Sequence, residues 1–171
     1  KRVRRRGCGP PPVRTRQHPE GLSPPPYGHA DELHRANAII DRLCALLVAA
    51  SKAGTKFAIE QPADRGDRSS PETFLFAEHG PLWLYPKIVD LRLNHSCRMC
   101  TFAQCRFGAP VEKYTSLLYS PDLADQLDSW NALACNHTKH DTLAGGKVDS
   151  KGDWSSRRHA AYPTALNAAL D

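Results

Sequence analysis

The sequence predicts an α/β fold: a parallel sheet with flanking helices, preceded by an extended proline-rich N-terminal arm. Three observations support this prediction. A long amphipathic helix leads through a glycine turn into a short apolar strand, which is the helix-to-strand half of a parallel unit. Further strand-like runs follow toward the C-terminus. Proline clusters at residues 10–12 and 24–26 interrupt a segment without helical or strand periodicity.

The length and charge of the chain limit its domain organisation. At 171 residues the chain is long enough for one modest domain, so we expect an arm at residues 1–29 and a single domain at residues 30–171. The net charge is +5, and the basic run at residues 1–6 contributes much of it. This excess favours nucleic acid or another polyanion as partner, although a solvated basic tail would have the same composition.

The elements are predicted in chain order from periodicity and from breaker residues. Apolar side chains recur at steps of three and four from Ala30 to Ala53, with Asp31 as the N-cap and Gly54 as the stop signal, so this segment is a helix. For residues 88–93 periodicity does not separate helix from strand. The remaining predictions are strands at 57–59, 99–103 and 114–119, and helices at 71–77, 121–133 and 160–170.

No membrane-spanning segment is predicted. The longest apolar run, Leu43–Ala50, is far shorter than the ~20 residues that a spanning helix needs. The basic start has no apolar segment behind it, so it does not have the pattern of a secretory signal. We therefore expect no membrane partner and an intracellular location, with the nucleus as one candidate compartment.

The first predicted strand is followed by Glu60, Gln61 and Pro62. In open parallel α/β sheets ligands bind at the carboxyl ends of the strands, so these three residues are candidate catalytic residues. A carboxyl and an amide there can hydrogen-bond the edge of a heterocycle, and a buried carboxylic acid can protonate a ring nitrogen. Alternatively, Glu60 caps a helix or pairs with an arginine.

Cysteine and histidine residues cluster in the second half of the chain. Cys97 and Cys100 form a C-x-x-C step, Cys105 lies five residues further on, and residues 135–140 read Cys-Asn-His-Thr-Lys-His. Zinc prefers four thiolate or imidazole ligands, and this clustering favours a metal site over a disulfide framework. Two ligand sets compete at this point, one of which would use Cys97 or Cys100.

A set of short stretches spans nearly the whole chain in a characteristic order: 9–14, 18–22, 35–37, 60–67, 81–83, 102–110, 113–115, 135–140 and 161–163. In these stretches the chain resembles a group of methyltransferase-like proteins found mainly in retroelement-rich genomes of algae and other protists. Those proteins carry a cytosine-methyltransferase-like Rossmann domain. The resemblance implies a Rossmann-like parallel sheet and a mobile-element-associated DNA methyltransferase-like function, with DNA as partner.

The resemblance also implies roles for the strand-end residues. The glutamate of this element contacts the target ring in cytosine methyltransferases, which corresponds to Glu60 here, and Gln61 stands in place of the family's asparagine. The glycine-rich turn for S-adenosylmethionine and the proline-cysteine nucleophile loop are missing. We therefore expect the C-terminal half of such a domain, incomplete or inactive alone, which uses S-adenosylmethionine only if an upstream half or a second chain supplies the site.

The metal ligands that the resemblance implies are Cys105, Cys135, His137 and His140, with zinc as the ion and Cys97 or Cys100 as substitutes. Against this stands a second interpretation, in which Cys105 is a small buried side chain and both histidines are surface residues.

Basic residues near these motifs are candidates for nucleic-acid contact. Arg106 and Lys113 alternate with aromatic residues, and Arg65 follows the strand end. Such interleaving can hold phosphates and stack bases. The alternative function is therefore a non-catalytic, zinc-stabilised nucleic-acid-binding module.

Overall fold

The computed structural model describes residues 12–140 and 161–170. Within them the chain forms two compact units. The larger unit holds residues 12–102 and 114–134, and the smaller unit holds residues 103–113, 135–140 and 161–170.

The long predicted helix is confirmed as α1, Ala30–Lys52. Asp31 and Glu32 lie in its first turn and Lys52 in its last, where their charges complement the helix dipole. Gly54 follows the helix with a φ of +68°, a left-handed conformation that suits glycine. A single-turn 3₁₀ helix, η1 (Pro26–Gly28), precedes α1.

The sheet has three strands, β1 (Ala58–Pro62), β2 (Arg98–Ala103) and β3 (Tyr114–Tyr119), in the order β1-β3-β2. The strands β1 and β3 are antiparallel, with Ala58 opposite Tyr119 and Pro62 opposite Thr115. The predicted parallel, Rossmann-like sheet is therefore wrong, because the sheet is antiparallel. A helix followed by a strand occurs in both kinds of sheet, so that order did not fix the direction in which β1 pairs.

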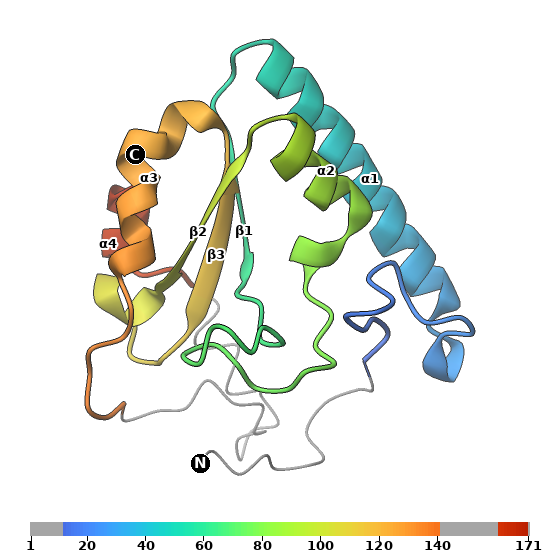
Figure 1. Ribbon diagram of the computed structural model, residues 1–171, viewed down its shortest axis with the longest axis horizontal. Helices are drawn as coiled ribbons and strands as arrows, with labels where there is room; N and C mark the ends of the chain where they lie inside the picture. The colour runs from blue at the N-terminus through green and yellow to red at the C-terminus, as the bar shows by residue number, and fades with distance from the viewer. Residues whose placement is uncertain (1–11, 141–160, 171) are drawn as a thin grey trace. The chain divides into compact units, whose positions relative to one another are not determined.

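The sheet of the larger unit is covered on both faces (Figure 1). On one face α1 packs beside α2 (Pro86–Asn94), and on the other face lies α3 (Ala124–Leu127). Side chains of α1, α2 and all three strands meet in the first layer: Cys44, Leu47, Ile88, Leu91 and Leu118 are buried there, with Ile59 and Met99 packed against them. Elsewhere in the larger unit the rings of Phe102 and Trp130 pack edge to face, with their centroids 5.0 Å apart.

The remaining helical elements are short. They are η2 (Leu82–Leu84), η3 (Gln104–Phe107), η4 (Pro121–Leu123), η5 (Asp128–Ala132) and α4 (Thr164–Ala168). The helix predicted at residues 121–133 is thus divided into η4, α3 and η5. The helix predicted at residues 71–77 is wrong, since these residues form turns and irregular structure. There the Thr73 hydroxyl donates to the Asp64 carbonyl at 3.0 Å.

The described part of the predicted arm packs against the larger unit. Arg14 donates to Asn37 on α1 at 2.6 Å, and Arg16 donates to both carboxylate oxygens of Asp64 at 3.0 and 2.7 Å. Thr15 forms an isolated antiparallel bridge with His79. These contacts tie residues 14–16 to the unit instead of leaving them as a free extension.

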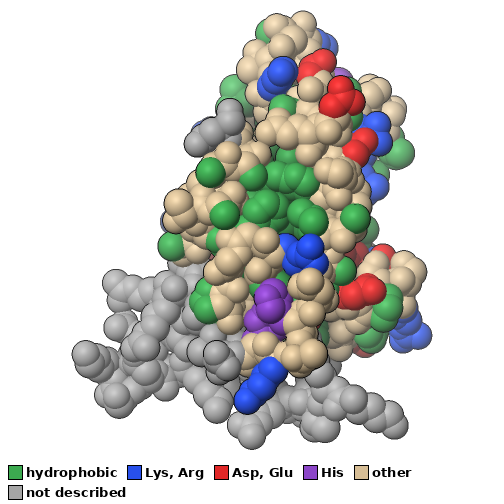
Figure 2. Space-filling view, turned by 90° about the vertical axis from the view of Figure 1, so that its left-hand side faces the viewer, with side chains coloured by type: hydrophobic (Ala, Val, Ile, Leu, Met, Phe, Trp, Pro, Cys, Tyr) green, Lys and Arg blue, Asp and Glu red, His purple; other side chains and the backbone are tan. Residues whose placement is uncertain are grey.

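The surface mixes polar, charged and hydrophobic side chains. Figure 2 shows one face on which hydrophobic side chains gather in one region, with charged side chains beside them. Across the described residues no helix combines the length and the apolar character needed to cross a membrane.

Candidate metal centre

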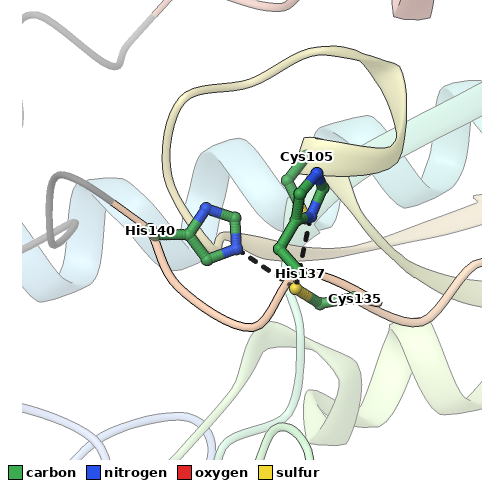
Figure 3. A group of neighbouring side chains, drawn as sticks. All are labelled: Cys105, Cys135, His137 and His140. Atoms are coloured by element: carbon green, nitrogen blue, oxygen red, sulfur yellow. Dashed lines mark hydrogen bonds between the residues drawn. The ribbon is translucent and has the colours of Figure 1, made fainter.

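Four potential metal ligands converge in the smaller unit. Cys105 comes from η3, and Cys135, His137 and His140 come from the segment at residues 135–140. One ligand atom from each side chain lies within 4.8 Å of all the others. Figure 3 shows both imidazole rings pointing at the Cys135 sulfur, with Cys105 beside His137.

The spacing of these atoms is close to that of a tetrahedral metal site. Cys135 Sγ lies 3.1 Å from His140 Nε2 and 3.7 Å from His137 Nδ1. Ligands at about 2.1–2.3 Å from a tetrahedral metal lie roughly 3.4–3.8 Å apart, so small side-chain shifts would complete such a shell. The cluster could therefore hold a metal ion, as the sequence predicted for these four residues.

The two thiols of the cluster differ in acidity. Partial burial acts to raise the pKa of Cys135, but hydrogen bonds from His140 and His137 outweigh it and lower that pKa to about 7. Burial, followed by the hydrogen bond and charge of Cys135, raises the pKa of Cys105 to about 11. The pKa of His140 is raised, chiefly by its hydrogen bond to Cys135. Cys135 is thus the thiol that is readily ionised near neutral pH.

The backbone around η3 fixes Cys105 and the loop that follows it. Gly108 ends η3 with a φ of +90°, which favours glycine, and its N–H donates to the Cys105 carbonyl at 3.1 Å. The Ala109 N–H donates to the Gln104 carbonyl at 3.2 Å. The ring of His140 hydrogen-bonds the Pro110 carbonyl. Such a bond from a ligand's imidazole to a carbonyl orients the ring in many metal sites.

The substitute ligands lie elsewhere. Cys97 and Cys100 are buried in the larger unit and are not members of the cluster. Cys97 Sγ lies 3.8 Å from the His95 carbonyl oxygen, and burial raises the pKa of Cys100 to about 11. Both behave as small buried side chains at the end of α2 and in β2.

The predicted catalytic residues Glu60, Gln61 and Pro62 lie within β1. The Thr115 hydroxyl of β3 donates to the Glu60 carboxylate at 2.9 Å, and the Pro62 carbonyl accepts a hydrogen bond from the Trp83 indole at 3.0 Å. Ligands bind at the carboxyl ends of strands in parallel α/β sheets, and β1 is antiparallel to β3. The position of these residues on the strand therefore does not indicate a base-binding site. The catalytic role of these residues remains a prediction.

The predicted nucleic-acid contacts lie in different settings. Arg106 is exposed on η3, and Lys113 is half-buried, with its Nζ 5.6 Å from the centroid of the Tyr162 ring. Both belong to the smaller unit. Arg65 belongs to the larger unit, and burial lowers its pKa. Its backbone is bound to the loop, because its carbonyl accepts from the N–H groups of Leu75 and Phe76.

Two features of the described residues had no signal in the sequence. Tyr162 is 43% exposed beside Lys113, and a small cavity adjoins it. A separate cavity of about 530 Å³ lies in the larger unit, where the hydroxyls of Thr101 and Ser116 on its wall are 2.7 Å apart. On the same wall Arg16 is paired with Asp64. The lining mixes acidic, basic and apolar side chains, so the larger cavity does not by itself select a class of ligand.

A scan against protein-family models, a search of curated proteins and a search of solved structures give no match for this chain.

Proposed function

We propose that the chain is a non-catalytic nucleic-acid-binding module whose smaller unit folds around a zinc ion. The observation that carries this proposal is the convergence of Cys105, Cys135, His137 and His140 within 4.8 Å. Two thiolates and two imidazoles form a donor set that zinc prefers, and hard divalent ions such as Mg²⁺ and Ca²⁺, which prefer oxygen ligands, fit it less well.

The number of ligands supports a structural site. Catalytic zinc sites keep a position open for water or substrate, whereas structural sites are closed by four protein ligands. Cys105 is buried, Cys135 and His140 are partly buried and His137 is exposed, and these four side chains together would fill the coordination shell of the ion. The zinc would therefore stabilise the fold instead of activating water.

Charge supports nucleic acid as the partner. The chain carries a net charge of +5, and Arg106 follows the metal ligand Cys105 directly in η3. A metal at Cys105 would hold η3 in place and with it the cation at position 106. Basic side chains on a fixed scaffold contact phosphates and supply most of the sequence-independent affinity for nucleic acids.

Metal analysis of the purified chain tests the zinc site. We expect about one zinc ion per chain, and loss of the ion and a lower Tm on Cys135→Ser or His137→Gln, because binding energy at a structural site is folding energy. Cys97→Ala and His34→Gln change the same residue types outside the cluster and should keep the zinc. Metal-free protein with an unchanged melting curve on chelation would refute the site.

Nucleic-acid binding is tested with the zinc-loaded chain and labelled oligonucleotides over a range of salt. Arg106→Gln and Lys113→Gln should each weaken binding and reduce the slope of log affinity against log salt by about 1 for each phosphate that the variant no longer neutralises. Lys56→Gln removes an exposed cation from the larger unit and serves as the control. Absence of binding at low salt would remove nucleic acid as the partner.

A further inference from the structure

A small cavity lies beside Tyr162 in the smaller unit. Its walls come from three segments: Gln104 in η3, the loop at residues 108–111, and residues 161–163. Its volume is about 90 Å³. That is far below the roughly 300–1,000 Å³ of pockets that enclose a whole drug-sized ligand. The cavity therefore has room for one ring of a larger molecule and not for the whole molecule.

An aromatic ring that lines the cavity has a cation beside it. Tyr162 is 43% exposed, and Lys113 Nζ lies 5.6 Å from the centroid of its ring. Lysine ammonium groups carry three donors, so a lysine over an aromatic ring retains donors for a phosphate. Aromatic rings next to basic side chains are the usual means by which proteins hold unpaired bases and the backbone that joins them.

The walls of the cavity are attached to the metal cluster. Gln104, whose side chain is 2% exposed, directly precedes the ligand Cys105. Pro110, on the loop, accepts a hydrogen bond from the ring of the ligand His140. On the third side Pro163 is the N-cap of α4, and α4 is anchored by Leu166, which is 2% exposed. An ion at the cluster would thus fix two of the three walls.

From these contacts we infer that the cavity beside Tyr162 receives one unpaired nucleobase of single-stranded nucleic acid, stacked on the Tyr162 ring, with Lys113 bound to an adjoining phosphate. This inference rests on the proposed nucleic-acid-binding function and names the form of nucleic acid that the smaller unit binds. Bases in a duplex are already stacked and paired, so they do not enter a cavity that takes a single ring.

The test measures fluorescence anisotropy of the zinc-loaded full chain with labelled oligothymidine, labelled oligouridine and a DNA duplex of the same length. The first two probes distinguish DNA from RNA as the source of the unpaired base. Tyr162→Ala should weaken single-strand binding roughly 5- to 150-fold, as removal of one stacked base does, and leave duplex binding nearly unchanged. Tyr162→Phe keeps the ring and should bind single strands almost as the parent chain does.

Leu170→Ala is the matched control, because Leu170 has the same 43% exposure and lies in the same unit. It should leave binding to all three probes unchanged. The zinc content of each variant is measured first, so that loss of binding through unfolding is distinguished from loss of binding through the missing side chain. Chelation of the parent chain should remove its preference for single strands, because two walls of the cavity lose their anchor.

The outcomes separate this inference from the proposed function. If the parent chain binds none of the three probes, the nucleic-acid function and the inference both fail. The inference alone fails if the parent chain binds nucleic acid and zinc-loaded Tyr162→Ala binds single strands equally well. It also fails if that variant loses affinity for single strands and for duplex to the same extent. Selective loss of single-strand binding in Tyr162→Ala, restored in Tyr162→Phe, supports it.

Discussion

Cys105 and Cys135 would bind the same ion, yet their thiols differ widely in acidity. Two imidazoles lower the pKa of Cys135 to about 7, whereas burial and the neighbouring thiol raise that of Cys105 to about 11. Metal ligands must be deprotonated, so the ion has to displace a proton from Cys105 throughout the neutral range. Cys135 loses its proton far more readily, so displacing that proton near neutral pH costs the ion much less.

Zinc binding should therefore depend on pH in two regimes. At neutral pH the ion has to displace at least the Cys105 proton, so log affinity should rise by about 1 or more for each pH unit. At lower pH the Cys135 proton has to be displaced as well, so the slope should become steeper, to about 2 or more. Titration against a competing chelator across roughly pH 6 to 8 measures the slope.

Cys97→Ala should reproduce the same pH profile, because Cys97 lies outside the cluster. A zinc affinity that does not change with pH would show that the thiols do not bind the ion.

Among the helices and strands, those with a clear hydrophobic pattern could be predicted from the sequence. The helix at residues 30–53 was recognisable because the apolar side chains of α1 face one core, and the strands near Met99 and Tyr114 because β-rich runs are short and bounded. The direction of β1 was not recognisable, since pairing with β3 depends on contacts between residues about sixty positions apart. The strand-end interpretation of Glu60 depended on that direction.

The same limit applies to the candidate site. Cys135, His137 and His140 are close in sequence, and their residue types alone suggest a metal. Cys105 was separated from Cys97 and Cys100 only by a family resemblance, because spacing allowed either choice. The position of Tyr162 beside Lys113 brings together residues that are far apart in the chain, and no local pattern indicates such an approach.

The attachment of residues 14–16 to the larger unit can be tested at Gly80. A Cβ at this position would lie 2.7 Å from the carbonyl carbon of Thr15, and backbone cannot move aside as a flexible side chain can. Gly80→Ala should therefore cost roughly 1–3 kcal/mol in free energy of unfolding. It should also expose the Arg16 amide, which donates to the Glu78 carbonyl at 3.3 Å, to hydrogen exchange.

Gly54→Ala is the comparison for this change. Nothing lies within 4 Å of a Cβ at Gly54, so its cost comes from the φ of +68° alone, about 1 kcal/mol, with no effect on the Arg16 amide. Equal exchange at Arg16 in both variants would contradict the packing of Thr15 on Gly80.

For the molecule as a whole, the two units rely on different sources of stability. The larger unit buries a continuous apolar cluster that includes Trp83, Ile88, Leu91 and Leu118. Among the described residues of the smaller unit, the buried apolar side chains are few: Ala103, Cys105, Val111 and Leu166. Burial at about 25 cal/mol per Å² over so few side chains gives little stabilisation, so an ion bound by the cluster would supply much of the stability of this unit.

Removal of the metal should therefore affect the chain unevenly. Structural zinc contributes about 10–16 kcal/mol of apparent binding free energy to small domains at neutral pH, far more than the few apolar contacts of the smaller unit can replace. After chelation, hydrogen exchange should become fast at the Gly108 and Ala109 amides, whose hydrogen bonds close the loop after Cys105. Amides of α1 and α2 should keep their protection, because the core that holds these helices contains none of the four ligands.

A chelator already saturated with zinc is the control and should change neither region. Equal loss of protection in both units, or no loss in either, would show that the ion does not hold the smaller unit together.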